Sequence, residues 1–316
     1  MFLLKGIGKG TDMSAAQPVV IPVAHKLDLK KILYATDFSE ASLAALPIAA
    51  ALARRFDSTL YVAHIWSALP ARMVSTFAAI SAFDQLQAAA DEQMMTLLKN
   101  ERLIPLKCVP VVAEGSPNDR ILPIVADQDI DLIVIGTQGK SGFKKLLLGS
   151  VAETVCRTAT CPVVTVGPNV DKRFYTAETI RNILCPVDLS GQSSAILPYA
   201  ASVASEFDSD ISLLHVLPAE VASKDIAGNL TRRLRQELQS LCKLHMSPRC
   251  ESNCRVEFGE PVETILSVAS QVRADLVALG IRPALPAGLL FKDTVTYKLM
   301  IGATCPVLTY RSRWWM

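Results

Sequence analysis

The sequence has no apolar run that approaches the roughly 20 residues needed to span a bilayer, although half of its residues are hydrophobic. Its charge is nearly balanced, and the formal net charge of +2 gives no electrostatic reason to expect nucleic acid or an anionic membrane as a partner. The opening segment Met1–Lys5 is too short for the core of a signal peptide, and Met13 offers a second start site. We therefore expect a cytoplasmic protein with an N-terminal extension.

The eight cysteines of this 316-residue chain do not suggest a disulfide framework, which is typical of much smaller secreted domains. Four soft ligands do gather in one stretch: Cys242, His245, Cys250 and Cys254. Their spacing, C-x2-H-x4-C-x3-C, is not one of the usual zinc patterns, and the alternative is a cysteine-rich helix end and loop. We predict no bound metal ion.

The sequence does contain an internal repeat, in which the same pattern of residues occurs twice. The stretch from Asp131 to Gly139 reads DLIVIGTQG, and the stretch from Asp275 to Pro283, 144 residues later (275 minus 131), reads DLVALGIRP. A Cys-Pro-Val motif follows in both stretches at the same offset. A chain of 316 residues is long enough for two domains of roughly 150 residues, each with its own core. We therefore predict a duplicated domain.

In both copies, short apolar runs alternate with segments of helical spacing. In the first copy we expect strands at 31–37, 58–65, 106–112, 132–136 and 162–167, and helices at 41–55, 83–101, from Gly115 onward, and at 149–158. Such alternation predicts a mostly parallel sheet that helices cover on both faces. In sheets of this kind, ligands bind beyond the carboxyl ends of the strands, where Asp37 and the loop Gly136–Gly139 are expected.

The most specific motif is a glycine-rich loop, G-x2-G-x9-G-S, formed by Gly136, Gly139, Gly149 and Ser150. Glycines let backbone N–H groups approach a phosphate closely, and a helix N-terminus adds oriented donors. Ser150 can supply a hydroxyl and cap the helix, and Lys140 brings positive charge to the loop. The alternative is that the glycines serve turns alone. The motif is neither a Walker loop nor the dinucleotide-binding fingerprint.

With these features the chain resembles a tandem universal stress protein. The resemblance is carried by the strand ending in Asp37-Phe-Ser, the strand ending in His64-Ile65, Gly115-x-Pro117 before a helix, and the glycine-rich loop. It implies two tandem α/β domains of the flavodoxin-like (HUP) type, each a doubly wound, five-stranded parallel sheet of order 3-2-1-4-5 with helices on both faces. The implied organisation is an N-terminal extension (1–27), domain 1 (28–168), a linker (169–178), domain 2 (179–311) and a C-terminal tail (312–316).

The resemblance also implies an ATP site in the first domain, with magnesium held mainly by the ATP phosphates. Asp37 would contact the nucleoside, the Ile65 backbone would approach the adenine, and Gly136 would pass close to the ribose. The phosphates would be held by Gly139, Gly149, Ser150 and the Val151 amide, beside Lys140, where the family often carries arginine. Two alternatives stay open: Asp37 as a helix cap, and Ile65 as plain core packing.

The second copy departs from the motif where phosphate would bind. Pro283 replaces the second glycine and removes a backbone donor. Asp293 replaces the third glycine and brings a carboxylate that repels phosphate. Although Asp188 matches Asp37, we predict one nucleotide site per chain, in the first domain.

Three functions are compatible with these features. The first is a nucleotide-binding stress-response or regulatory protein, whose ATP occupancy alters its association with an unknown protein partner. The second is a slow ATPase or nucleotidyl-transferring enzyme, although no nucleophile constellation can be assembled, and the matched His64 and His215 are expected to pack or hydrogen-bond. The third is a non-nucleotide interaction scaffold. The apolar last strands, Pro162–Val166 and Pro306–Tyr310, are expected to pair within the chain as a pseudo-dimer or between chains as a homo-oligomer.

Overall fold

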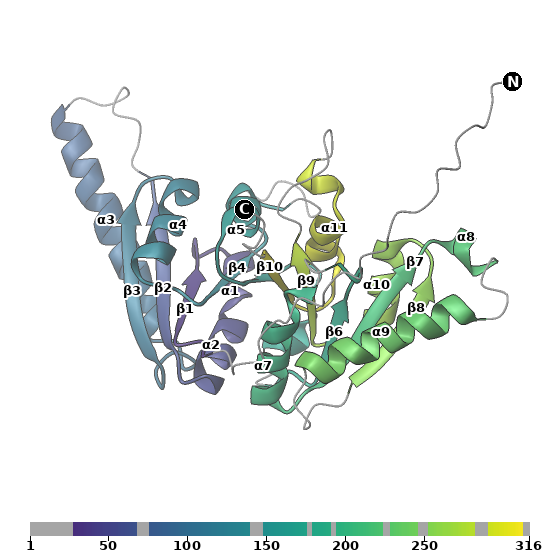
Figure 1. Cartoon of the computed structure of the whole chain (residues 1–316). Helices are drawn as coiled ribbons and strands as arrows, with labels where there is room; N and C mark the ends of the chain where they lie inside the picture. Colours follow the sequence, from purple (N-terminus) through teal and green to yellow (C-terminus); the bar gives the residue numbers. More distant parts are fainter. Residues whose placement is uncertain are drawn as a thin grey trace, which may run out of the picture.

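The computed structural model of the protein describes residues 28–67, 76–139, 148–175, 179–190, 194–223, 228–245, 252–281 and 290–311. They form two α/β domains side by side (Figure 1). The first contains β1 (Lys31–Ala35), α1 (Glu40–Leu43), α2 (Leu46–Arg55), β2 (Thr59–Trp66), α3 (Thr76–Leu98), β3 (Lys107–Glu114), α4 (Pro117–Asp127), β4 (Leu132–Gly136), α5 (Ser150–Thr158) and β5 (Val163–Val166). After the short 3-10 helix η2 (Lys172–Tyr175), the second contains β6 (Asn182–Pro186), α7 (Leu197–Phe207), β7 (Asp210–Leu217), α8 (Ala219–Ala222), α9 (Asn229–His245), β8 (Ser252–Phe258), α10 (Pro261–Gln271), β9 (Leu276–Ile281), η3 (Phe291–Asp293), α11 (Val295–Gly302) and β10 (Val307–Arg311).

The strands of both domains form one ten-stranded sheet, in the order β3-β2-β1-β4-β5-β10-β9-β6-β7-β8. Each half of this order is 3-2-1-4-5 when the strands of that domain are numbered along the chain, as predicted. Neighbouring strands within each domain are parallel. Each half therefore has a switch in strand order between its first and fourth strands, which is where such sheets bind ligands.

The last strands of the two domains pair with each other in the middle of the sheet. β5 and β10 are antiparallel, with Val164 opposite Leu308. Two buried hydroxyls add to this ladder: Thr165 donates to the Val307 carbonyl (3.3 Å) and Thr309 donates to the Val163 carbonyl (3.2 Å). The last strands were predicted to pair either within the chain or between chains, and in the structure they pair within the chain.

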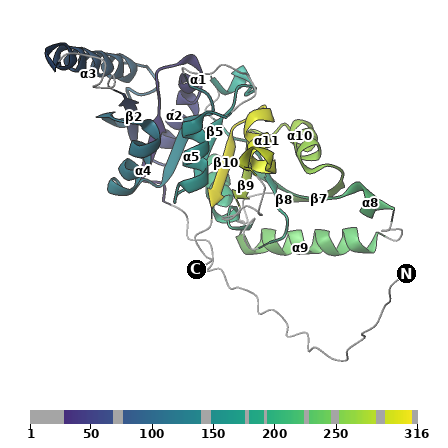
Figure 2. The ribbon, with the colours of Figure 1, turned by 90° about the horizontal axis from the view of Figure 1, so that it is seen from above.

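Helices cover both faces of the sheet, and in the second domain α9 lies on the face opposite α10 and α11 (Figure 2). Because both faces are covered, β4 is buried along its whole length, as expected for an apolar run in a parallel sheet. Among the described residues, no helix combines the length and the apolar character that crossing a membrane requires.

The structure corrects two of the predicted helices. The single helix predicted at 41–55 is divided into α1 and α2, with Pro47 in the first turn of α2. Proline lacks the amide N–H of a helix interior, so it begins a helix more readily than it continues one. The helix predicted at 83–101 begins earlier, at Thr76, and ends at Leu98. Both corrections concern helix boundaries and leave the order of the elements unchanged.

Candidate nucleotide site

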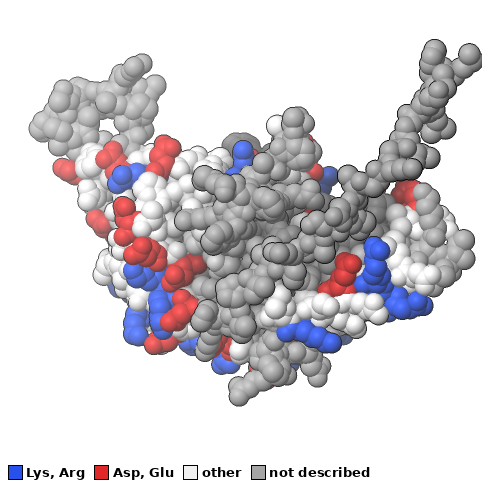
Figure 3. All heavy atoms as spheres, in the orientation of Figure 1, with Lys and Arg blue, Asp and Glu red and all other residues white. Residues whose placement is uncertain are grey.

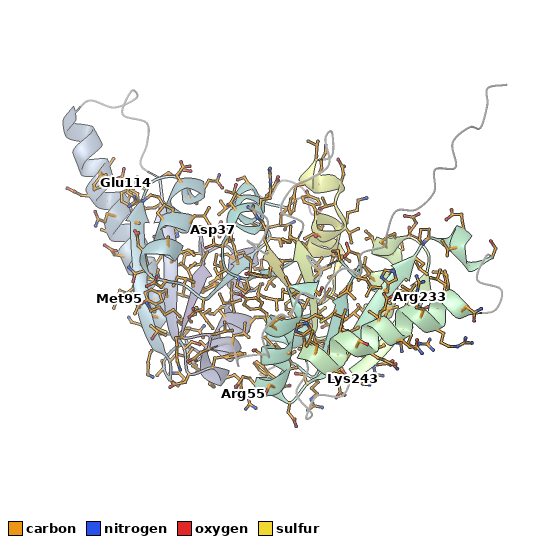
Figure 4. The ribbon with its side chains drawn as sticks, viewed as in Figure 1. Asp37, Arg55, Met95, Glu114, Arg233 and Lys243 are labelled. Carbon is orange, nitrogen blue, oxygen red and sulfur yellow. The ribbon has the colours of Figure 1, made fainter. Side chains whose placement is uncertain are left out.

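A cavity of about 280 Å³ opens at the carboxyl ends of β1, β2 and β4, beside the start of α5. This volume is close to the lower end of the range of about 300–1,000 Å³ for small-molecule pockets. Asp37, labelled in Figure 4, lies at this end of the sheet. Seven of the eight predicted site residues line the cavity: Asp37, Ile65, Gly136, Gly139, Gly149, Ser150 and Val151. The eighth, Lys140, lies outside the described residues.

The carboxylate of Asp37 is held in place by the turn that follows β1. Its Oδ1 accepts hydrogen bonds from the Ser39 amide (3.0 Å) and the Ser39 hydroxyl (2.5 Å). Its Oδ2 lies so close to Gly139 that a Cβ atom on that glycine would be 2.6 Å away. The helix cap is Ser39, whose hydroxyl accepts from the Ser42 amide at the start of α1. Asp37 therefore braces the capping residue and does not itself cap the helix.

Gly136 is required by packing at the end of β4. A Cβ atom there would lie 2.8 Å from the Ala41 carbonyl oxygen and 3.0 Å from the Ser42 Cα. Both are backbone atoms of α1, which cannot swing away as the end of a flexible side chain can. Close packing alone therefore explains why residue 136 is a glycine, without any contact to a ligand.

The N-terminus of α5 lines the cavity, and no described side chain caps it. The N-cap residue is Gly149, so the prediction that Ser150 caps the helix is wrong: Ser150 is the first residue inside the helix. The amides of the first helical turn have no acceptor within the helix, and Ser150, Val151 and Ala152 all line the cavity. Together with the helix dipole they favour an anion at this place.

The amide of Gly149 itself is engaged by the protein. It donates a 2.7 Å hydrogen bond to the Thr137 carbonyl and so closes the loop onto the end of β4. The expected phosphate contact from Gly149 is therefore not available through its N–H group. The amides of the first turn of α5 are better placed for that role.

Three buried hydroxyls line the cavity that the motif did not predict: Thr36, Ser42 and Thr137. The hydroxyls of Thr36 and Ser42 are 3.0 Å apart and hydrogen-bonded. The Thr137 hydroxyl has no hydrogen-bond partner among the described residues. The sequence could have pointed to two of these hydroxyls through a comparison of the two copies. In the second domain, apolar Val187 and Ile281 occupy the places of Thr36 and Thr137.

The second domain keeps the turn at the end of its first strand. Asp188 accepts from the Ser190 amide (2.9 Å) and hydroxyl (2.5 Å), as Asp37 does from Ser39. The residue after the aspartate, Phe38 in the first copy and Leu189 in the second, has the same left-handed backbone, with φ of 61°. His64 and His215 each pair through Nδ1 with a strand-end carbonyl at 2.8 Å, in agreement with the predicted hydrogen-bonding role. This turn is therefore common to the fold and independent of the glycine-rich loop.

The start of α11 differs from that of α5. Thr294 caps α11, and its hydroxyl accepts a 3.2 Å hydrogen bond from the Tyr297 amide. The carboxylate of Asp293 accepts from the Leu290 amide (3.3 Å). The Thr294 side chain thus occupies an amide at the start of α11, whereas no described side chain does so at the start of α5. Pro283 lies outside the described residues.

The cysteine-rich stretch does not form a metal centre in the part of the chain that the structure describes. Cys242 and Cys254 are close together, with 3.5 Å between their sulfur atoms. His245 is buried, and Cys250 lies outside the described residues. Among the described side chains, no group of three or more His, Cys, Asp or Glu residues could hold a metal ion.

Comparison with known proteins supports this architecture. Residues 28–167 and 179–311 each match the model of the "Universal stress protein family". A universal stress protein of Methanocaldococcus jannaschii is 36% identical over 150 residues, which cover 43% of this chain and 81% of that protein. One of Mycobacterium tuberculosis is 29% identical over 169 residues, covering 51% of this chain and 55% of that protein. The crystal structure of a universal stress protein from Archaeoglobus fulgidus superposes with a TM-score of 0.69 at 21% identity, covering 90% of this chain and 99% of that one, so the fold of the whole tandem is shared.

Proposed function

Because the chain belongs to the universal stress protein family, we propose that its first domain binds ATP and that occupancy of this site alters the association of the protein with partners. The observation that carries the proposal is the start of α5, which no described side chain caps and which lines one cavity together with the carboxylate of Asp37. The site would hold one ATP per chain.

Two of the groups that line the cavity favour one orientation of the ligand. The first-turn amides of α5 favour the anionic phosphates, whereas the carboxylate of Asp37 repels them and can accept hydrogen bonds from nucleoside hydroxyls. Ile65, in β2, is buried and lines the cavity, and its apolar side chain suits the flat face of a base. Because Gly139 lies close to Asp37, we expect this glycine to lie beside the bond that joins the ribose to the first phosphate. Magnesium, when bound, would neutralise phosphate charge and be held mainly by the phosphates.

The lining of the cavity favours binding over hydrolysis. Among the described residues that line it, Asp37 is the one with a titratable side chain, and hydrogen bonds from Ser39 hold its carboxylate. Hydrolysis of ATP needs a group that orients a water molecule near the terminal phosphate. A regulatory role therefore agrees better with these residues than a catalytic one.

The variant Gly149→Asp tests the proposal, since it introduces the residue found in the second domain. The backbone at Gly149 has φ of −64° and ψ of 148°, which any residue adopts, and aspartate is a good N-cap residue. The added Cβ atom would lie 3.3 Å from the Thr137 carbonyl oxygen, so the variant should fold once this contact relaxes slightly, and yet repel phosphate from the start of α5. In the unaltered protein, ATP with magnesium at a hundred times the dissociation constant should raise the free energy of unfolding by about 2.7 kcal/mol.

The rise should disappear in Gly149→Asp and persist in the matched control Asp293→Gly, which alters the same place in the second domain. Chemical unfolding with and without ATP measures both effects. No rise in the unaltered protein would favour the scaffold function. A full rise in Gly149→Asp would show that the nucleotide binds elsewhere.

A further inference from the structure

Cys242 lies on the buried face of α9, which packs on β8, the edge strand of the second domain. Leu234, Leu238 and Cys242 follow one another at four-residue intervals and are all buried. Cys254 lies in β8, on which α9 packs, and is partly exposed. The sulfur atoms of Cys242 and Cys254 are 3.5 Å apart, in contact but not bonded. A buried thiol and a reachable thiol thus form a pair.

The other described cysteines lack this combination of proximity and access. Cys156, Cys161, Cys185 and Cys305 are buried, and burial raises the pKa of Cys156 and of Cys305 to about 12. Cys108 is partly exposed, but its thiol is directed at the Leu103 carbonyl at 3.7 Å. Proximity and access therefore coincide in the pair Cys242 and Cys254.

The pair belongs to the second domain alone. Strand pairing places Cys254 opposite Leu213 and, in the first domain, Pro110 opposite Val62. Val62 and Leu213 are equivalent at the 151-residue offset of the two β2-type strands (213 minus 62). Proline therefore stands where Cys254 would be, so the duplicated fold does not itself require this cysteine.

We propose that Cys242 and Cys254 are a reversible dithiol–disulfide site that a hydroperoxide oxidises. The Cys254 thiol gives up its proton, and the thiolate attacks an oxygen of hydrogen peroxide; the O–O bond breaks, sulfenic acid is left on Cys254, and the departing hydroxide takes up that proton as water. The thiol of Cys242 then attacks the sulfenic sulfur, so that the S–S bond forms and a second water is released. Two thiols lose two electrons and two protons, and one hydrogen peroxide becomes two waters. A dithiol reductant restores both thiols by exchange.

The surroundings of the pair determine how readily it reacts. The hydrogen bond with Cys242, followed by burial, raises the pKa of the Cys254 thiol, whereas the positive charge of Arg235 opposes this rise. Basic side chains gather over the outer face of α9 (Figure 3), and Arg233 and Lys243 are labelled there in Figure 4. Because thiolate is scarce, oxidation should be slow compared with that of a catalytic cysteine. Such a site responds to sustained oxidant.

The bridge would tie the last turn of α9 to β8 and restrict the unfolded chain between them. The oxidised protein should therefore unfold at a higher temperature than the reduced protein. The cavity of the first domain is formed by other elements, so the inference does not depend on ATP binding.

Mass spectrometry of the full-length protein tests the proposal. The protein is incubated with hydrogen peroxide, its free thiols are alkylated, and its peptides are mapped without reduction. The expected product is a cross-link between Cys242 and Cys254 that has lost two hydrogens and that dithiothreitol reverses. The variant Cys254→Ser should lose the cross-link, and the matched control Cys185→Ser, in strand β6, which β7 separates from β8, should keep it.

Two outcomes would overturn the inference. One is that Cys242 and Cys254 both remain alkylatable while other thiols are oxidised. The other is that either cysteine is cross-linked to Cys250 or is converted to sulfinic acid without a bridge. Because the unaltered protein gives the primary result, a variant that fails to fold does not obscure it.

Discussion

The substitution Gly139→Ala tests whether the contact between the glycine-rich loop and Asp37 sets the affinity for ATP. The added Cβ atom would lie 2.6 Å from Oδ2 of Asp37, where about 3.4 Å is an ordinary contact, so the carboxylate must retreat by about 0.8 Å (3.4 minus 2.6). This retreat is feasible because the carboxylate is the end of a side chain and Gly139 is not in the left-handed backbone region. The variant should therefore fold.

The size of the expected loss in ATP affinity follows from the hydrogen bonds of the Asp37 carboxylate. A retreat of Asp37 disturbs the bonds from the Ser39 amide and hydroxyl and moves the acceptor away from the nucleoside. One hydrogen bond to a charged group contributes about 1.5–3 kcal/mol. Its loss corresponds to a rise of about 10- to 150-fold in the dissociation constant for ATP.

Calorimetric titration with ATP and magnesium measures this rise, and a double-mutant cycle identifies its cause. If the alanine acts by displacing Asp37, then Gly139→Ala should cost little further affinity in a protein that already carries Asp37→Ala. An equal loss of affinity in both backgrounds would refute this reasoning, because the alanine would then act on the ligand or on the loop directly.

Two further predictions concern stability. Gly136→Ala should lower the free energy of unfolding by about 1–3 kcal/mol, because the new Cβ meets the backbone of α1 at 2.8 Å; an unchanged urea midpoint would contradict this. Thr137→Val should raise the free energy of unfolding by about 1 kcal/mol, because it removes a buried hydroxyl that has no partner among the described residues. A fall in the stability of Thr137→Val, measured by the same unfolding assay, would show that the hydroxyl is satisfied in the folded protein.

The apolar runs of the sequence were sufficient to predict the strands, and the family resemblance implied their order. The strand Leu132–Gly136 has the bounds predicted for it, because a continuous apolar run between polar segments is typical of a strand buried on both faces. The rule that ligands bind at the carboxyl ends of such strands also placed Asp37 beside the glycine-rich loop. The structure brings these two features into contact.

The hydrogen bonding of the loop was not predictable from the motif. A pattern of glycines does not reveal whether the Gly149 amide faces a ligand or donates to the Thr137 carbonyl, because that depends on how the loop closes. The cap of α5 was mispredicted for a similar reason: a serine at a helix start is equally compatible with the N-cap and with the first helical position, and Ser150 takes the latter. The Thr137 hydroxyl lies outside the fixed positions of the motif, and the signal for it in the sequence was the replacement of Thr137 by Ile281 in the second copy.

We propose that one domain of the pair binds the nucleotide and the other does not. The most direct measurement is the stoichiometry of ATP binding to the full-length protein by isothermal titration calorimetry in the presence of magnesium. We predict one ATP per chain, lost in Gly149→Asp and kept in Asp293→Gly. Two ATP molecules per chain, or none, would contradict the account.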